Sequence, residues 1–281
     1  MVTEADLTLP DGRRLHVYDT HPDDRGERLA VFWHHGTPNI GAPPTPLFAA
    51  AERLGLRWVS HDRPAYGGST PQPERQVASV AADVTHIADA LDIEHFAAMG
   101  HSGGGAHALA CGARLPERVL AVVSISGLAP HGAPDLDYFA GFWPTGAAEL
   151  RAAVQGRETL AACLASGTFD PETFTAADHA ALNGPWAWLN EVVGPAQAAG
   201  PEGMIEDDLA SVRPWGFDPA GVRAPLLLLH GGQDRMVPCA HGEWLARHCA
   251  TATLRLSPED GHLSILSGAE AALEWLAEQA K

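Results

Sequence analysis

The amino-acid sequence predicts an α/β protein: a doubly wound, mostly parallel sheet of eight strands, interrupted by an inserted helical cap. Three observations support this prediction. A hairpin pattern opens the chain, apolar runs then alternate with helical segments, and the same alternation returns near the end. The stretch between these parts is helical and punctuated by glycine and proline. We therefore predict a core made of residues 1–130 and 213–281, with the cap at 131–212.

The predicted strands show two hydrophobic patterns. The first two strands alternate apolar and polar residues around an Asp11-Gly12 turn, which indicates a hairpin. Most of the others are continuous apolar runs, as expected for strands buried on both faces of a parallel sheet. In chain order the predicted strands are residues 5–9, 14–18, 29–33, 57–61, 95–99, 119–125, 225–230 and 252–256.

The predicted helices show apolar residues at helical spacing, most clearly in segment 77–91. Pro116 prevents the helix that precedes it from extending further. In the core the predicted helices are residues 46–54, 77–91, 103–115, 240–248 and 268–279. In the cap they are residues 146–165, 175–182, 185–193 and 201–212.

The 281-residue chain is strongly acidic, since it has 35 Asp and Glu residues against 18 Lys and Arg, a formal net charge of −17. Such a chain repels the phosphates of nucleic acids and the surfaces of anionic membranes. Its first residues include no basic segment, and no stretch approaches the roughly 20 apolar residues of a membrane span. We expect a cytoplasmic monomer or homodimer that acts on a small-molecule substrate and binds neither nucleic acid nor membrane.

The cysteines and histidines show no metal-binding pattern. The four cysteines form no C-x-x-C pair, and an even number in a chain this long does not indicate a disulfide framework. The 15 histidines include no H-E-x-x-H motif. We therefore expect reduced thiols, no metal site and no cofactor.

The most informative local feature is Ser102, which lies in the sequence GHSGG at residues 100–104. An apolar strand precedes this motif and a helix follows it. Small residues on both sides of the turn allow strand and helix to approach closely, so that the serine hydroxyl is presented at the carboxyl edge of the sheet. This context predicts a nucleophilic serine.

A serine hydroxyl needs a base, and the base needs an acid that orients it. Asp234 follows strand 225–230 and is the candidate acid, while His262 follows the last strand and is the candidate base. The order serine, acid, histidine is the one expected when the serine occupies a nucleophile elbow. Asp260 is the rival acid, although it is better explained as a loop carboxylate.

Taken together, the motifs resemble the α/β-hydrolase superfamily, in its single-cap branch of serine hydrolases, over essentially the whole chain. The matching pieces are HGTP at 35–38, DRPAYGGS at 62–69, GHSGG at 100–104, GQD at 232–234 with Val237-Pro238, and GH at 261–262. The resemblance implies that the backbone N–H groups of Thr37 and Gly103 form the oxyanion hole. Since Gly103 opens a helix, its amide and the helix dipole suit a developing negative charge.

The predicted cap is acidic and rich in large aromatic residues. If the cap closes over the serine, it excludes water and presents an apolar wall to the substrate. His35, His101, Trp143 and Trp186 are the candidates for lining or supporting the pocket. We expect His35 to hold the oxyanion loop and His101 to pack under the site or line its rim.

These features predict a serine hydrolase that cleaves a small, apolar or aromatic carboxylic ester or lactone through an acyl-enzyme. The serine at the elbow disfavours branches of the superfamily that use a carboxylate nucleophile. A proline iminopeptidase-like aminopeptidase is an alternative, with cap acids Glu191, Glu202 and Glu206 as candidates to hold an amino terminus, although relatives of that type usually carry Trp where this chain has His101. A carbon–carbon bond hydrolase, a cofactor-free peroxidase-like enzyme and a non-catalytic ligand receptor on the same scaffold remain open.

Overall fold

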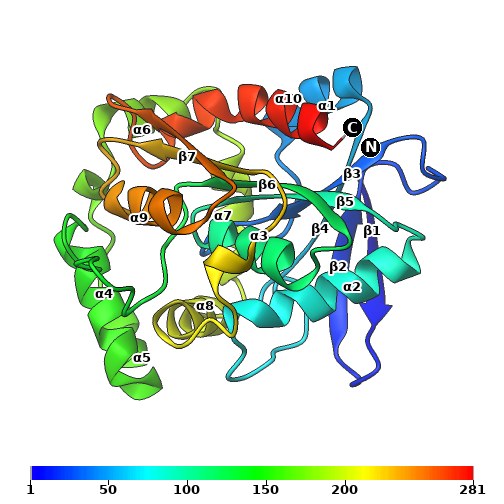
Figure 1. Ribbon diagram of the computed structural model, residues 1–281. Coiled ribbons are helices and arrows are strands. Elements are labelled where there is room, and N and C mark those ends of the chain that lie inside the picture. The colour runs from blue at the N-terminus through cyan, green and yellow to red at the C-terminus, as the bar shows by residue number, and fades with distance from the viewer. Residues whose placement is uncertain (1, 281) are drawn as a thin grey trace.

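The computed structural model describes residues 2–280 and places all eight strands in one sheet, in the order β1-β2-β4-β3-β5-β6-β7-β8 (Figure 1). β1 and β2 form the antiparallel hairpin, and β2 is also antiparallel to β4. The remaining neighbours are parallel. The predicted eight-stranded, mostly parallel sheet is therefore confirmed. The strands are β1 (Thr3–Thr8), β2 (Arg14–Asp19), β3 (Leu29–His34), β4 (Leu56–His61), β5 (Phe96–His101), β6 (Val119–Ile125), β7 (Leu226–Gly231) and β8 (Ala252–Ser257).

Helices cover both faces of this sheet. They are α1 (Phe48–Leu54), α2 (Val80–Ala90), α3 (Gly103–Arg114), α9 (Ala240–His248) and α10 (Ala269–Gln279). In Figure 1, α1 and α10 lie above the sheet, and α2, α3 and α9 lie below it. The doubly wound arrangement predicted from the sequence is thus present.

The alternation of side chains along each strand builds two hydrophobic cores. On β3, Ala30 and Phe32 belong to the core between the sheet and helices α2, α3 and α9. Val31 and Trp33 belong to the core beneath α1 and α10. Because both faces of β3 are buried, its sequence is a continuous apolar run.

Five helices lie between β6 and β7, in the stretch predicted as the cap. They are α4 (Pro144–Gln155), α5 (Arg157–Ser166), α6 (Ala176–Leu182), α7 (Leu189–Gln197) and α8 (Glu202–Val212). The segment 146–165, predicted as one helix, is two helices, because Gly156 breaks it with a φ of 117° that favours glycine. The helix predicted at 185–193 begins later, at Leu189, after a run of turns.

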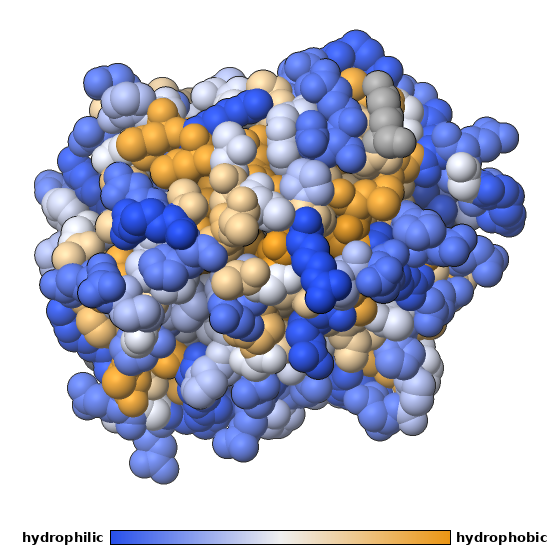
Figure 2. Space-filling model, viewed as in Figure 1, coloured by the Kyte–Doolittle hydropathy of each residue, from blue (hydrophilic) through white to orange (hydrophobic). Residues whose placement is uncertain are grey.

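The surface in the view of Figure 2 is mostly hydrophilic, and its apolar residues gather mainly in the upper half, where Figure 1 places α10. Within residues 2–280, no helix combines the length and apolar character needed to cross a membrane.

Candidate active site

Ser102 occupies a strained turn between β5 and α3, with φ 57° and ψ −128°. Its backbone N–H donates to the carbonyl of Ile125 at 2.8 Å, which ties the turn to β6. A Cβ on Gly100 would lie 2.1 Å from the carbonyl oxygen of Gly104, so only glycine permits this close approach of strand and helix. The GHSGG motif therefore forms the sharp strand–turn–helix that the sequence predicted.

Asp234 and His262 come from the loops after β7 and β8 and meet at the carboxyl edge of the sheet. Nδ1 of His262 donates to Oδ2 of Asp234 at 2.8 Å, and both side chains are buried. The other oxygen, Oδ1, accepts from the backbone N–H groups of Met236 and Val237. Since Asp234 holds the Nδ1 proton, Nε2 of His262 is left as the nitrogen that can accept one.

The charges of this pair stabilise each other. Burial acts to lower the pKa of His262, but the carboxylate of Asp234 outweighs it and holds the pKa above its ordinary value. Burial likewise acts to raise the pKa of Asp234, but His262 outweighs it and holds that pKa below its ordinary value. The pair therefore favours an imidazolium next to a carboxylate, as general base catalysis requires.

His101 connects the elbow to the histidine loop. Its Nε2 donates to the backbone carbonyl of His262 at 3.0 Å, and the two rings lie 4.9 Å apart between centroids. Burial lowers the pKa of His101 to about 3, so its ring is neutral at physiological pH. Because His101 directly precedes Ser102, β5 places the serine and the histidine loop side by side.

Thr37, in the loop after β3, lies close to Gly103, the first residue of α3. A Cβ on Gly103 would lie 2.6 Å from Oγ1 and 3.8 Å from the backbone nitrogen of Thr37. A Cβ on Gly36 would lie 3.5 Å from the Cβ of Ser102, so the Thr37 loop also adjoins the serine. The two backbone amides implied as an oxyanion hole thus lie beside the elbow.

His35 and Arg63 hold the Thr37 loop through hydrogen bonds to its backbone. Nδ1 of His35 donates to the carbonyl of Gly36 at 2.8 Å, and its Nε2 accepts the backbone N–H of Arg63 at 3.1 Å. The guanidinium of Arg63 donates to the carbonyls of His35 and Gly36. Burial keeps the pKa of His35 well below its ordinary value, so His35 acts as a neutral support.

The two tryptophan candidates occupy different places. Nε1 of Trp143 donates to Asp170 at 2.8 Å, and the guanidinium of Arg235 lies 5.1 Å from the centre of its ring. Since Arg235 follows Asp234 in the chain, Trp143 lies near the acid loop. Trp186 is buried in the core that contains Trp33 of β3, which favours a supporting role.

Asp260, the rival acid, and the candidate glutamates Glu202 and Glu206 bind other partners. Oδ2 of Asp260 accepts from the hydroxyl of Ser257 at 2.6 Å. Arg157 forms ion pairs with Glu202 and Glu206. These contacts support the assignment of Asp260 as a loop carboxylate and leave the two glutamates paired with Arg157.

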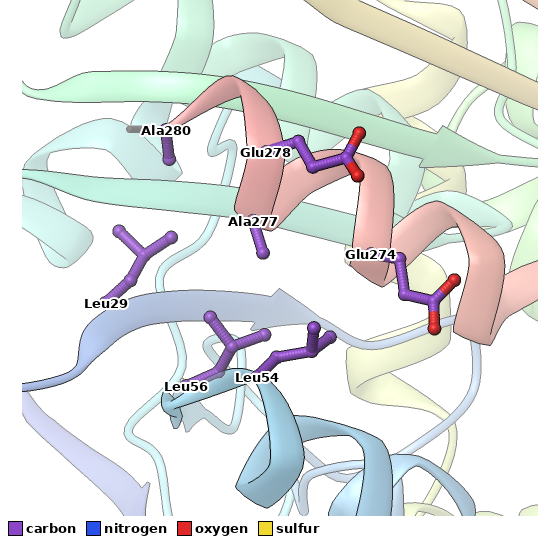
Figure 3. A pocket seen from close by; sticks show the side chains of 7 residues that line it. All are labelled: Leu29, Leu54, Leu56, Glu274, Ala277, Glu278 and Ala280. Atoms are coloured by element: carbon purple, nitrogen blue, oxygen red, sulfur yellow. The ribbon is translucent and has the colours of Figure 1, made fainter.

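A cavity of about 380 Å³ lies away from these residues. Figure 3 shows it between α10 and the beginnings of β3 and β4, with Leu29, Leu56 and Ala277 on its walls. Those strand beginnings form the amino edge of the sheet, whereas Ser102, Asp234 and His262 follow carboxyl ends. The cavity is therefore separate from the candidate active site.

Sequence reasoning missed two buried aspartates between β6 and β7 that contact the site, Asp178 in α6 and Asp207 in α8. Asp178 accepts hydrogen bonds from the backbone directly after His262. Asp207 accepts a hydrogen bond from the side chain of Thr37. A helix-capping pattern, Thr175 followed by Asp178, was visible in the sequence, but nothing local indicates that either carboxylate reaches the core.

The sequence profile of the alpha/beta hydrolase fold family matches residues 30–269, and the chain is an enzyme that belongs to this family. The chain is 29% identical over 255 residues to a non-heme chloroperoxidase of Streptomyces lividans, with 83% of each chain covered. Its fold is similar to that of the enol-lactonase from Burkholderia xenovorans LB400, with a TM-score of 0.70, 20% identity, and 98% of this chain and 99% of that chain covered. It is also similar to a thermophilic esterase from Thermogutta terrifontis, with a TM-score of 0.69, 22% identity, and 99% and 100% covered.

Proposed function

We propose that the protein is a serine hydrolase that cleaves a carboxylic ester or lactone through an acyl-enzyme. The observation that carries this proposal is the buried 2.8 Å hydrogen bond between His262 and Asp234. His262 also contacts His101, the residue directly before the strained elbow serine Ser102. The names of the structural neighbours, an enol-lactonase and esterases, support the same class of reaction.

In the proposed reaction His262 takes the hydroxyl proton of Ser102 as the serine oxygen attacks the substrate carbonyl. Asp234 keeps the Nδ1 proton in place and stabilises the imidazolium. The oxyanion accepts hydrogen bonds from the amides of Thr37 and Gly103, each worth roughly 2.7–4 kcal/mol in the transition state. His262 then returns its proton to the leaving alkoxide, and water, activated by the same histidine, releases the acid and restores the serine.

We propose a small substrate with an apolar or aromatic group. The segment between β6 and β7 is rich in aromatic residues, and it is acidic, which disfavours anionic substrates. The alternative aminopeptidase is weakened, because Glu202 and Glu206 already form ion pairs with Arg157. A cytoplasmic location, a monomer or homodimer, and the division into core and cap stay predictions.

A fluorophosphonate probe and a panel of p-nitrophenyl esters, lactones and proline naphthylamide test this function. We expect labelling at Ser102 alone, and hydrolysis of apolar esters or lactones in preference to anionic ones. Ser102→Ala should lose labelling and at least about 10³-fold of kcat. Ser126→Ala, a control at another buried serine with positive φ, should be labelled as the wild type is. Full labelling of Ser102→Ala, or no turnover of any substrate by the wild type, would reject the proposal.

A peroxidase-like activity is the second candidate, and the name of the Streptomyces lividans relative favours it. Hydrogen peroxide in place of water would attack the acyl-enzyme, giving a peracid and restoring Ser102. The peracid would then oxidise a halide to hypohalite and become the carboxylic acid again. Halogenation of a phenol that needs acetate, peroxide and bromide together, and that Ser102→Ala lacks, would establish it; halogenation retained in Ser102→Ala would exclude this route.

A further inference from the structure

Asp178 lies in the first turn of α6 and is only 1% exposed. Its two carboxylate oxygens bind two different parts of the molecule. Oδ2 accepts from the backbone N–H and the hydroxyl of Thr175, at 3.0 and 2.9 Å, and so caps α6. Oδ1 accepts from the backbone N–H groups of Leu263 and Ser264, both at 2.8 Å.

The two residues held by Oδ1 directly follow His262. The residue before it is packed against the same carboxylate, because a Cβ on Gly261 would lie 2.1 Å from Oδ2 of Asp178. From β5, His101 donates to the carbonyl of His262. The backbone around His262 is therefore fixed by β5 of the core and by α6 together.

Asp178 also contributes charge. Burial acts to raise its pKa, but the amides of Ser264, Thr175 and Leu263 outweigh burial and hold the pKa below its ordinary value. The carboxylate is thus ionised at neutral pH. Its charge adds to that of Asp234 in raising the pKa of His262.

Four titratable groups face His262 from the elements packed around it. They are Asp234 and His230 from β7 and the loop after it, His101 from β5 and Asp178 from α6. Burial lowers the pKa of both His101 and His230, which leaves these rings neutral near pH 7. The two aspartates are therefore the charges that act on His262.

We propose that Asp178 is a positioning residue: through the backbone of Leu263 and Ser264 it fixes His262 at the distance and orientation that proton transfer from Ser102 requires. The inference rests on the proposed function and adds a residue from α6 to the support of its base. A misplacement of about 1 Å can cost an enzyme on the order of 10²-fold in rate.

Asp178→Asn tests this role, because an amide has one acceptor oxygen and cannot bind both the α6 cap and the histidine loop. We expect kcat/KM for a p-nitrophenyl ester and the rate of fluorophosphonate labelling to fall by about 10- to 100-fold. KM should change little. With one negative charge removed, the pKa of His262 falls, so the acid limb of the pH profile moves to lower pH.

Thr175→Ala is the matched control, because it removes the hydroxyl from the α6 cap and leaves both bonds of Oδ1 to the histidine loop. Both variants should show a lower Tm. Only Asp178→Asn should change the pH profile and the labelling rate. If Thr175→Ala reproduces both changes, or Asp178→Asn shows neither, Asp178 serves only to cap helix α6 and the proposal is wrong.

NMR titration of the His262 ring gives a readout that needs no turnover. Its pKa should be lower in Asp178→Asn than in the wild type. If the wild type hydrolyses nothing while this pKa still falls, the proposed function fails and the contact between Asp178 and the histidine loop stands; an unchanged pKa rejects the charge effect. Should Asp178→Asn not fold, Asp178→Ser, which keeps a capping hydroxyl for α6, is measured in the same way.

Discussion

The hydroxyl of Thr37 donates to Oδ2 of Asp207 at 2.6 Å, which joins the loop of the proposed oxyanion hole to helix α8. The same carboxylate accepts from Arg63, Arg75 and the hydroxyl of Tyr66. Burial acts to raise the pKa of Asp207, but the two guanidinium groups outweigh it and hold that pKa well below its ordinary value. The carboxylate of Asp207 thus supplies the counter-charge for Arg63 and Arg75 and fixes the Thr37 loop.

Asp207→Asn should destabilise the protein by about 3–5 kcal/mol, because it leaves Arg63 and Arg75 buried without their counter-charge. Urea unfolding measures the change. Glu191→Gln, at an exposed position of the neighbouring helix α7, should stay within about 0.5 kcal/mol of the wild type. Equal stability of the two variants would mean that the buried network contributes little.

Activity should fall as the pH decreases through the pKa of His262, because only the neutral ring can accept the serine proton. Since Asp234 raises this pKa, the midpoint of the acid limb should lie above the ordinary histidine value of about 6.5. A pH profile of kcat/KM measures it, with His248→Gln as a control at an exposed histidine. A flat profile between about pH 5 and 8 would argue against a histidine base.

Asp234→Asn should lower kcat by about 10²–10⁴-fold, because Asn cannot hold the imidazole in the required tautomer. Asp260→Asn should cost little, since its carboxylate bonds to Ser257. Ester hydrolysis by the two purified variants separates these roles. The opposite ranking would make Asp260 the catalytic acid.

Ser102→Gly should be more stable than Ser102→Ala, although neither can act as a nucleophile. The backbone at this position, with φ 57° and ψ −128°, suits glycine, and such strain costs on the order of 1–3 kcal/mol. The two variants differ only by the Cβ atom, so their thermal unfolding compares the strain directly. Equal Tm values would show that the backbone at Ser102 stores no strain.

The sequence predicted the sheet well, because strands buried on both faces have continuous apolar runs and glycines mark the elbow around Ser102. Asp234 and His262 could be found for a related reason, since each follows a recognisable strand. Asp178 could not, because its partners at Leu263 and Ser264 lie 85 and 86 residues away and meet it only in the folded chain. Gly156 shows a further limit: a single glycine did not reveal that one predicted helix is two.

Asp178 and Asp207 both lie between β6 and β7 and both end against loops of the core. This arrangement limits how freely the segment can be exchanged between relatives by protein engineering. A transplanted segment that lacks an acid at either place would leave buried amides or guanidinium groups without an acceptor. Chimaeras built to alter substrate preference should therefore keep these two carboxylates and vary the residues around them.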